Sequence, residues 1–113
     1  MFGFGKPAKT GFETIDGAEA ATRVEQGAAL IDVREPDEYA AGHIAGAVNV
    51  PLSRFASEAH RIPAGRPAIL YCAAGMRSER ALGVCANLGL DVKAHVGGGI
   101  SALARAGMAV RRG

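Results

Sequence analysis

One cysteine stands in a context that can convert an ordinary thiol into a reactive thiolate. Cys72 follows the apolar run Ala68–Tyr71 and precedes small residues, an arginine and a serine. A helix N-terminus and a nearby cation stabilise a thiolate and lower its pKa below the free value of about 8.5. Gly75 allows the loop to curl with its amides inward, Arg77 adds positive charge, and Ser78 is expected to cap the following helix. The pattern predicts a cup of backbone amides that binds an anion and activates Cys72 as a sulfur nucleophile.

The alternative for Cys72 is purely structural, because a free cysteine is commonly a small buried hydrophobe. Cys85 fits that description better, since it lies on the apolar stripe of the helix predicted after the loop, and we expect it in the core. The histidines His43, His60 and His95 form no compact ligand spacing with these cysteines, so no metal or other cofactor is predicted.

The loop length bears on which anion it could hold. Four residues separate Cys72 from Arg77, one fewer than in protein phosphatases that use a cysteine nucleophile. The tighter loop suits a terminal sulfur atom better than a tetrahedral phosphate. This loop and two further sequence blocks make the chain resemble the rhodanese family, also called thiosulfate sulfurtransferases. The blocks that carry the resemblance are Leu30–Tyr39 continued by Gly42–Pro51, the loop Cys72–Ser78, and Gly98–Ile100 with Gly107–Val110.

The resemblance implies both a fold and a reaction. The fold would be α/β, a single domain with a mostly parallel five-stranded sheet flanked by helices on both faces. The reaction would move a sulfane sulfur from a donor, thiosulfate or a persulfide, to a thiophilic acceptor through a Cys72 persulfide, as in a thiosulfate:cyanide sulfurtransferase. The nucleophile would be Cys72, and the loop that binds substrate and persulfide would be Ala73, Ala74, Gly75, Met76, Arg77 and Ser78.

The donor, the acceptor and two other functions stay open at this point. Ala73 and Ala74 bring no polar side chain to the loop, so we expect thiosulfate to be a poorer donor than a persulfide carried by a small thiol or a protein. The acceptor would be a thiol or cyanide, and a sulfur-relay protein is a possible partner. Arg77 could bind substrate or only brace the loop. The other functions are a non-catalytic binding or regulatory module of the same fold, and a cysteine-based phosphatase or arsenate reductase.

Four polar residues of the first block are expected to support the site rather than to react. Asp32, Arg34 and Glu38 should form a buried or half-buried network that fixes the turn after a strand, because buried charges need partners. His43 is expected to stabilise the next turn. The run Gly97–Gly99 lacks the order of a phosphate-binding fingerprint and is expected to pack tightly near the active loop.

Alternating strand and helix signals place these residues in the predicted fold. Strands are expected at residues 14–15, 29–33, 48–50, 68–71 and 92–96. Helices are expected at residues 16–27, 36–42, 52–60, 78–88 and 100–105. Such alternation predicts a mostly parallel sheet with both faces covered, and sites in such sheets form beyond the carboxyl ends of strands. Cys72 occupies such an end, and His95 lies on a strand from which it could reach the edge of the site.

Composition sets the remaining limits. A chain of 113 residues with 49% hydrophobic and 5% aromatic residues predicts one domain with an aliphatic core. The net charge of +2 is too small to indicate nucleic-acid binding, and no segment approaches the roughly 20 apolar residues of a membrane span. Without a signal-peptide pattern, we expect a cytoplasmic monomer. Residues 1–12 are expected to form a flexible lead-in, and residues 13–113 the domain.

Overall fold

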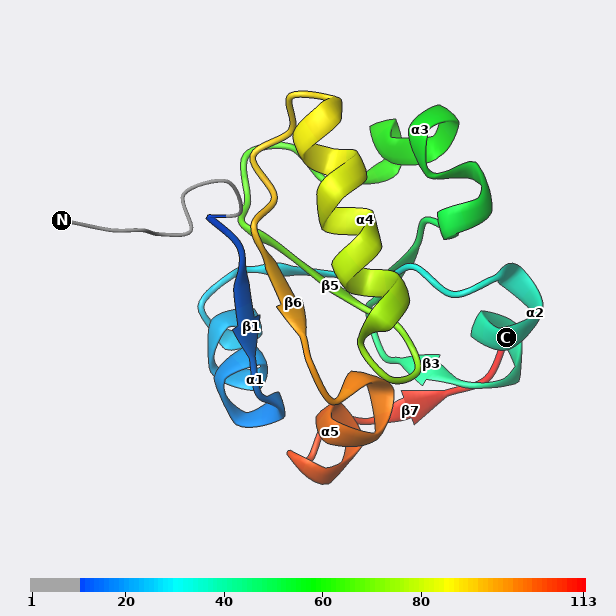
Figure 1. The fold of residues 1–113 in the computed structure, drawn as a ribbon. Coiled ribbons are helices and arrows are strands. Elements are labelled where there is room, and N and C mark those ends of the chain that lie inside the picture. The colour runs from blue at the N-terminus through cyan, green and yellow to red at the C-terminus, as the bar shows by residue number, and fades with distance from the viewer. Residues whose placement is uncertain (1–10) are drawn as a thin grey trace, which may run out of the picture.

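The computed structural model describes residues 11–113, and most of the predicted lead-in lies outside them. A single sheet of five strands forms the centre of the fold, in the order β1–β6–β5–β2–β4 (Figure 1). Every pair of neighbouring strands in it is parallel, which confirms the predicted α/β class. The strands are β1 (Glu13–Ile15), β2 (Ala29–Asp32), β4 (Val48–Asn49), β5 (Ala68–Tyr71) and β6 (Ala94–Val96).

Helices cover both faces of the sheet, and the alternation of side chains along β5 shows which face belongs to which helix. Leu70 and Cys72 pack in one core cluster with residues of α3 (Phe55–Glu58) and α4 (Met76–Asn87). Ile69 and Tyr71 point the other way, into a cluster with residues of α1 (Gly17–Glu25) and α5 (Gly99–Arg105). Period-two alternation therefore assigns Cys72 to the α3 and α4 face. The remaining helix, α2 (Pro36–Ala41), follows β2.

Two predicted helices differ from the observed ones. The helix expected at residues 52–60 is instead the short α3 between two 3₁₀ turns, Leu52–Arg54 and Ala59–Arg61. The helix after the loop begins at Met76, and its N-cap is Gly75 rather than Ser78. A left-handed glycine replaces the expected serine cap, so the Ser78 side chain lies in the first turn and is free to contact Cys72.

A second, two-stranded sheet was not predicted. The strand β3 (His43–Ile44) pairs antiparallel with β7 (Val110–Arg111), which brings the end of the chain beside the segment after α2 (Figure 1). Strands of two residues are too short to show hydrophobic alternation, so the sequence pattern carries no signal for them.

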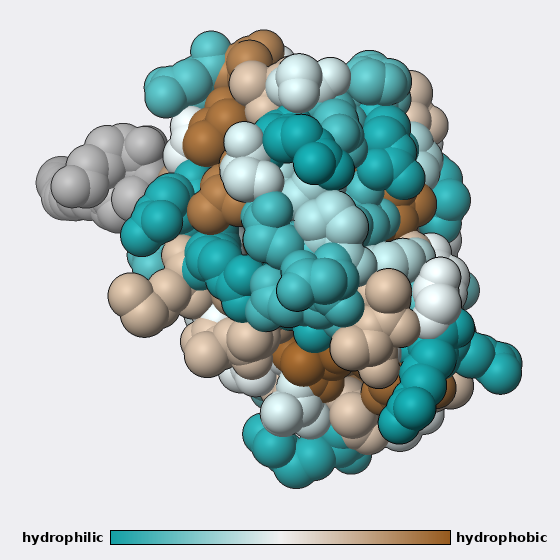
Figure 2. Space-filling model, turned by 90° about the vertical axis from the view of Figure 1, so that its right-hand side faces the viewer, coloured by the Kyte–Doolittle hydropathy of each residue, from teal (hydrophilic) through white to brown (hydrophobic). Residues whose placement is uncertain are grey.

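The outer surface is mostly polar on the side of α2 and α3. Figure 2 shows hydrophilic residues over the upper part and centre of that face, with hydrophobic residues interspersed in its lower part. None of the helices within residues 11–113 combines the length and the apolar character needed to cross a membrane.

Candidate active site

The loop that carries Cys72 is built on close backbone packing. Gly75 has φ +101°, and a Cβ atom there would collide with the carbonyl oxygen of Gly97. A Cβ atom on Gly99, at φ +66°, would likewise collide with the carbonyl oxygen of Ala73, and the Ile100 amide donates to the Cys72 carbonyl at 2.9 Å. The glycine run after β6 therefore packs against the loop, as predicted, and holds the loop curled.

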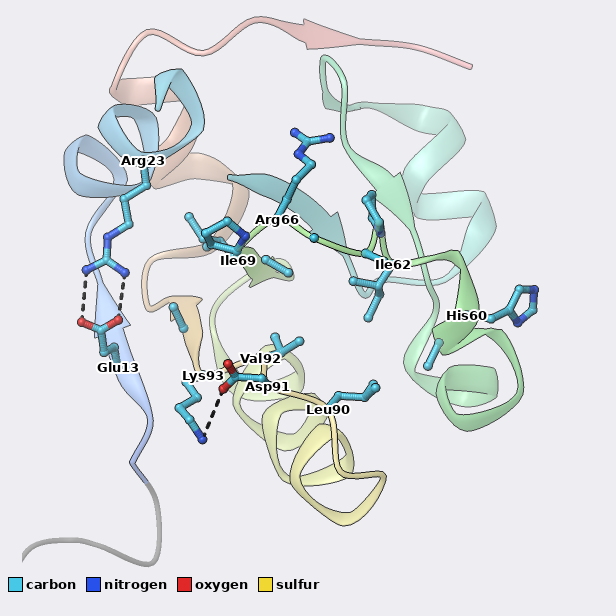
Figure 3. Close-up of a pocket in the computed structure, with 17 residues that line it drawn as sticks. Glu13, Arg23, His60, Ile62, Arg66, Ile69, Leu90, Asp91, Val92 and Lys93 are labelled. Carbon is cyan, nitrogen blue, oxygen red and sulfur yellow. Dashed lines mark hydrogen bonds and ion pairs between the residues drawn. The ribbon is translucent and has the colours of Figure 1, made fainter. Parts of the chain in front are cut away.

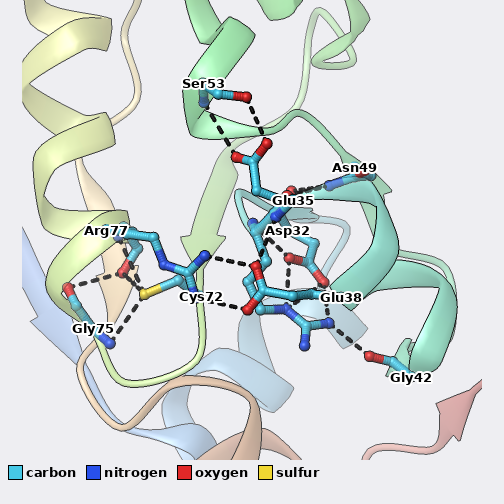
Figure 4. A network of polar contacts seen from close by, with 11 residues as sticks. Asp32, Glu35, Glu38, Gly42, Asn49, Ser53, Cys72, Gly75 and Arg77 are labelled. Atoms are coloured by element: carbon cyan, nitrogen blue, oxygen red, sulfur yellow. Dashed lines mark hydrogen bonds and ion pairs between the residues drawn. The ribbon is translucent and has the colours of Figure 1, made fainter.

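The Cys72 sulfur lies inside this loop, in front of inward-pointing donors (Figure 4). Its Sγ accepts hydrogen bonds from the amides of Gly75 at 3.1 Å and Ser78 at 3.3 Å. The Ser78 hydroxyl oxygen lies 3.6 Å from Sγ. Cys72 is only 1% exposed, so a reactant has to reach a sulfur at the floor of the loop.

Burial and hydrogen bonding act in opposite directions on the Cys72 thiol. Burial alone raises its pKa, because the thiolate loses its hydration. Hydrogen bonds from the Ser78 hydroxyl and from the amides of Ser78, Ala74 and Gly75 outweigh burial, so the pKa of Cys72 lies below its usual value. Cys85 is fully buried without such donors, and burial raises its pKa to about 11. The two cysteines are thus buried to the same extent, but the pKa of one thiol is lowered and that of the other is raised.

The Arg77 guanidinium forms a bidentate ion pair with the Glu38 carboxylate. Its Nη1 lies 2.7 Å from Glu38 Oε1 and its Nη2 lies 3.0 Å from Glu38 Oε2. The guanidinium lowers the pKa of Glu38 to about 2. Glu38 is the main reason that the pKa of Arg77 is raised, and the negative charge of Cys72 adds to it. Arg77 is therefore close enough to act on the thiolate electrostatically, while two of its hydrogen-bond donors are used by Glu38.

Asp32 and Arg34 form a separate buried ion pair at the carboxyl end of β2. Arg34 Nη2 lies 2.7 Å from Asp32 Oδ2 and also donates to the Gly42 carbonyl at 2.6 Å. The Asn49 amide, which the sequence reading missed, donates to the carbonyls of Asp32 and Arg34, both at 2.9 Å. These contacts fix the backbone where the turn begins.

His43 lies at the turn after α2, apart from the charged side chains of Asp32, Arg34 and Glu38. Its ring stacks on Tyr39 at a centroid distance of 3.7 Å, and its Nδ1 bonds the Tyr39 carbonyl oxygen at 2.8 Å. His43 thus ties β3 back to α2, and no hydrogen bond joins its side chain to those of the other three.

Comparison with known protein families identifies the fold. The family described as Rhodanese-like domain matches residues 16–106, which is most of the chain. The chain belongs to this rhodanese-like family. The resemblance read from three sequence blocks is confirmed.

Similar proteins carry the rhodanese-like domain in different settings. The uncharacterized protein YqhL of Bacillus subtilis is 50% identical over 54 residues, which cover 48% of this chain and 43% of YqhL. The probable adenylyltransferase/sulfurtransferase MoeZ of Mycobacterium tuberculosis is 42% identical over 79 residues, covering 68% of this chain and 20% of MoeZ. A rhodanese-related protein from Thermoplasma volcanium has a crystal structure that matches with a TM-score of 0.77 at 29% identity, covering 88% of this chain and 98% of that one. The chain spans less than half the length of these two curated relatives.

Two residues beside the rhodanese-like loop extend the site beyond the predicted set. His95 Nδ1 lies 2.8 Å from the Ser78 hydroxyl oxygen, and His95 Nε2 lies 3.0 Å from the Thr14 hydroxyl oxygen. The sequence had suggested that His95 reaches the edge of the site, and it does so through Ser78. Thr14 was missed as a site residue, although its position on a strand was expected.

A cavity lies elsewhere in the part of the domain that the structure describes. It has a volume of about 790 Å³ and is lined by residues at the start of β5 and β6, including Ala68, Ile69 and Ala94 (Figure 3). The Glu13–Arg23 ion pair, at 2.8 Å, borders it. Cys72 follows the opposite, carboxyl end of β5, where sites form in parallel sheets, so the cavity is separate from the candidate active site. Within residues 11–113, no three His, Cys, Asp or Glu side chains are grouped closely enough to hold a metal ion.

Proposed function

We propose that this rhodanese-like domain is a sulfurtransferase that carries a sulfane sulfur on Cys72. The observation that carries the proposal is the placement of Sγ, which accepts hydrogen bonds from the amides of Gly75 and Ser78. Such preformed donors stabilise an anion without reorganisation, and removing one comparable donor in an enzyme costs about 3 kcal/mol of transition-state stabilisation. The same donors suit the thiolate and the terminal sulfur of a persulfide.

Sulfur transfer would proceed in two half-reactions. The Cys72 thiolate attacks the outer sulfur of a persulfide donor, the donor's S–S bond breaks, and the departing thiolate leaves with the bonding electron pair. Cys72 then holds a persulfide. An acceptor thiolate, or cyanide in an assay, attacks the outer sulfur, the Sγ–S bond breaks, and the Cys72 thiolate is restored. This sequence predicts ping-pong kinetics.

The environment of the loop favours a persulfide over thiosulfate as the donor. Thiosulfate is a dianion and needs cationic or hydrogen-bonding partners for its sulfonate oxygens. The Arg77 guanidinium is already bound at both ends by Glu38. Met76, at the start of α4, is 74% exposed and offers an apolar contact to an organic thiol or a partner protein. We therefore assign Arg77 to bracing the loop. We propose that the sulfur donor is a small persulfide or a sulfur-relay protein. We further propose that the enzyme is a cytoplasmic monomer.

Intact mass spectrometry after incubation with one donor at a time tests the proposal. Thiosulfate, mercaptopyruvate and glutathione persulfide are compared, and we expect one sulfur atom to be gained, most rapidly from glutathione persulfide. Cys72→Ser should abolish the gain while circular dichroism shows an intact fold, and Cys85→Ala should retain it, since Cys85 lies in the core.

The same assay separates the competing functions. Failure of the folded protein to gain sulfur from any donor would favour a non-catalytic binding or regulatory module. Release of phosphate from a phosphate ester, without a gain of sulfur, would favour a cysteine-based phosphatase. The short Cys72–Arg77 spacing and the Glu38-bound guanidinium argue against the phosphatase.

A further inference from the structure

A chain of polar side chains leads from the Cys72 sulfur to the edge of the sheet. Sγ lies 3.6 Å from Ser78 Oγ, Ser78 Oγ lies 2.8 Å from His95 Nδ1, and His95 Nε2 lies 3.0 Å from Thr14 Oγ1. Thr14 and His95 are direct partners in the parallel pairing of β1 with β6, so the backbone register places their side chains together. Cys72 and His95 are buried, whereas Thr14 is exposed.

The Ser78 hydroxyl links the two titratable ends of this chain, because its single proton is shared among His95 Nδ1 at 2.8 Å, the Gly75 carbonyl oxygen at 3.2 Å and Cys72 Sγ at 3.6 Å. When that proton points at His95 Nδ1, the hydroxyl oxygen can accept the S–H of a Cys72 thiol. When His95 Nδ1 itself carries a proton and donates it to Ser78, the hydroxyl proton is free to point at a Cys72 thiolate. The protonation of His95 and that of Cys72 are therefore coupled through one oxygen atom.

We infer that His95 is the proton acceptor for the Cys72 thiol, with Ser78 as the relay and Thr14 as the group that orients the imidazole. The inference rests on the proposed role of Cys72 as the nucleophile. His95 would be a positioning residue, because it contacts Ser78 and not the sulfur donor or acceptor.

The step balances with two protons moving in the same direction. In the resting state Cys72 S–H donates to Ser78, Ser78 O–H donates to His95 Nδ1, and His95 Nε2–H donates to Thr14. The thiol proton passes to the Ser78 oxygen as the hydroxyl proton passes to Nδ1. The products are a thiolate that accepts from Ser78 and an imidazolium that donates from both nitrogens. Thr14 accepts from Nε2 in both states, which keeps the Nδ1 lone pair facing Ser78 beforehand.

The surroundings of His95 suit a base that is neutral at rest. Burial lowers the pKa of His95, so the imidazole is unprotonated at neutral pH and able to accept a proton. The titratable groups that act on it are Glu79 of α4, whose negative charge opposes the effect of burial, and Cys72 across Ser78. A thiolate at Cys72 and the Glu79 carboxylate both favour the imidazolium.

The pH dependence of Cys72 alkylation tests the relay without any sulfur donor. Iodoacetamide labelling is followed by intact mass from pH 4.5 to 9.5, with Cys72→Ser as the blank for labelling elsewhere. In His95→Gln we expect the pH midpoint of labelling to rise by about one unit, which makes labelling about tenfold slower at pH values below the midpoint. Thr14→Val should raise the midpoint by a smaller amount, and Thr14→Ser, which restores the hydroxyl, should return it to the wild-type value.

His60→Gln provides the matched control, because His60 is exposed and, within residues 11–113, bonds only a local carbonyl oxygen, that of Ser57. Its labelling midpoint should equal that of the wild type. A second readout is the NMR titration of the His95 ring. Its midpoint should fall in Cys72→Ser, since coupling between two sites is reciprocal.

An unchanged midpoint in a folded His95→Gln protein would overturn the relay. If His95→Gln does not fold, the exposed Thr14→Val variant decides, and an unchanged midpoint there would overturn it as well. Neither result would affect the gain of sulfur by the wild-type protein, which tests the proposed function separately. If the wild-type protein gains no sulfur but the variants still shift the pH midpoint of Cys72 alkylation, the proposed function is rejected and the relay is retained.

Discussion

Arg77 and Glu38 join the two halves of the candidate site by a two-point ion pair. Arg77 belongs to the first turn of α4, next to the Cys72 loop, and Glu38 belongs to α2, after β2. Their side chains are 32% and 35% exposed, so the pair lies at the mouth of the site and is partly screened by water. The sequence left open whether Arg77 binds substrate or braces the loop, and this contact supports bracing.

The first prediction concerns donor choice. Glu38→Gln removes the carboxylate that occupies the Arg77 guanidinium and leaves the cation free for an anionic donor. We expect sulfur transfer from thiosulfate to cyanide to improve severalfold in kcat/KM, mainly through a lower KM, because a new charge contact strengthens binding of the dianion. Transfer from glutathione persulfide should change little.

Glu58→Gln is the control for this prediction. Glu58 also pairs with arginine, at 2.8 Å from Arg54, but it lies on α3 and removal of its charge should not alter thiosulfate use. A Glu38→Gln protein with unchanged or weaker thiosulfate kinetics would mean that Arg77 is not the element limiting this donor.

A second prediction follows from the acid titration of the same carboxylate. In the folded protein the pKa of Glu38 is about 2, below the usual 4.5, so its contribution to stability is complete above about pH 5 and is lost as the pH falls toward 2. At pH 6, Glu38→Gln should unfold with a free energy about 1 kcal/mol or less below that of the wild type, as expected for a partly exposed pair.

Urea denaturation at pH 6, 4 and 3 measures this difference. The difference should shrink as the pH falls below 4.5, because the Glu38 carboxyl of the unfolded wild-type chain becomes protonated before that of the folded protein, while the glutamine does not titrate. A difference that stays constant down to pH 3 would show that the amide perturbs packing rather than charge.

The sequence predicts the sheet and the loop well because both have strong local signals. The strand Ala68–Tyr71 has the predicted bounds, and the cysteine at its carboxyl end lies among amide donors. Alternating strands and helices were enough to predict a parallel sheet. The order of the strands, with β1 and β6 at one edge, depends on long-range pairing, which local patterns do not encode.

The remaining errors concern contacts that tertiary packing decides. The helix after the loop begins at Met76 because Gly75 takes a left-handed conformation against Gly97, a contact invisible in the local sequence. The Thr14–His95 contact arises from the register of two strands that are far apart in sequence. Glu38 binds Arg77 instead of joining the Asp32–Arg34 pair, because packing brings the first turn of α4 beside α2.

The third prediction concerns the loop glycine. Gly75→Ala adds a Cβ atom at φ +101°, where it would meet the Gly97 carbonyl, so the loop must shift and its amide must move away from Sγ. We expect the free energy of unfolding to fall by about 2 to 3 kcal/mol, from the left-handed strain and the backbone clash together. The pH midpoint of Cys72 alkylation should rise as the donor is lost.

Gly27→Ala separates strain from the effect on the site. Gly27 has φ +110° but nothing within 4 Å of an added Cβ, so only the backbone strain of about 1 kcal/mol should appear. Thermal or urea denaturation gives the stabilities, and alkylation rates give the effect on the thiolate. Equal alkylation midpoints in the two variants would contradict the role of the Gly75 amide.

The fourth prediction sets the two cysteines against each other. Cys72 and Cys85 are 1% and 0% exposed, so accessibility does not distinguish them. Hydrogen bonds hold the pKa of Cys72 below its usual value, whereas burial raises that of Cys85 to about 11. Because the thiolate is the nucleophile, brief treatment of the native protein with iodoacetamide at pH 7 should add one label, at Cys72, and treatment in urea should add two. Peptide mapping locates the label. Labelling of Cys85 at a rate similar to Cys72 in the folded protein would mean that loop opening, and not the amide donors, governs thiol reactivity.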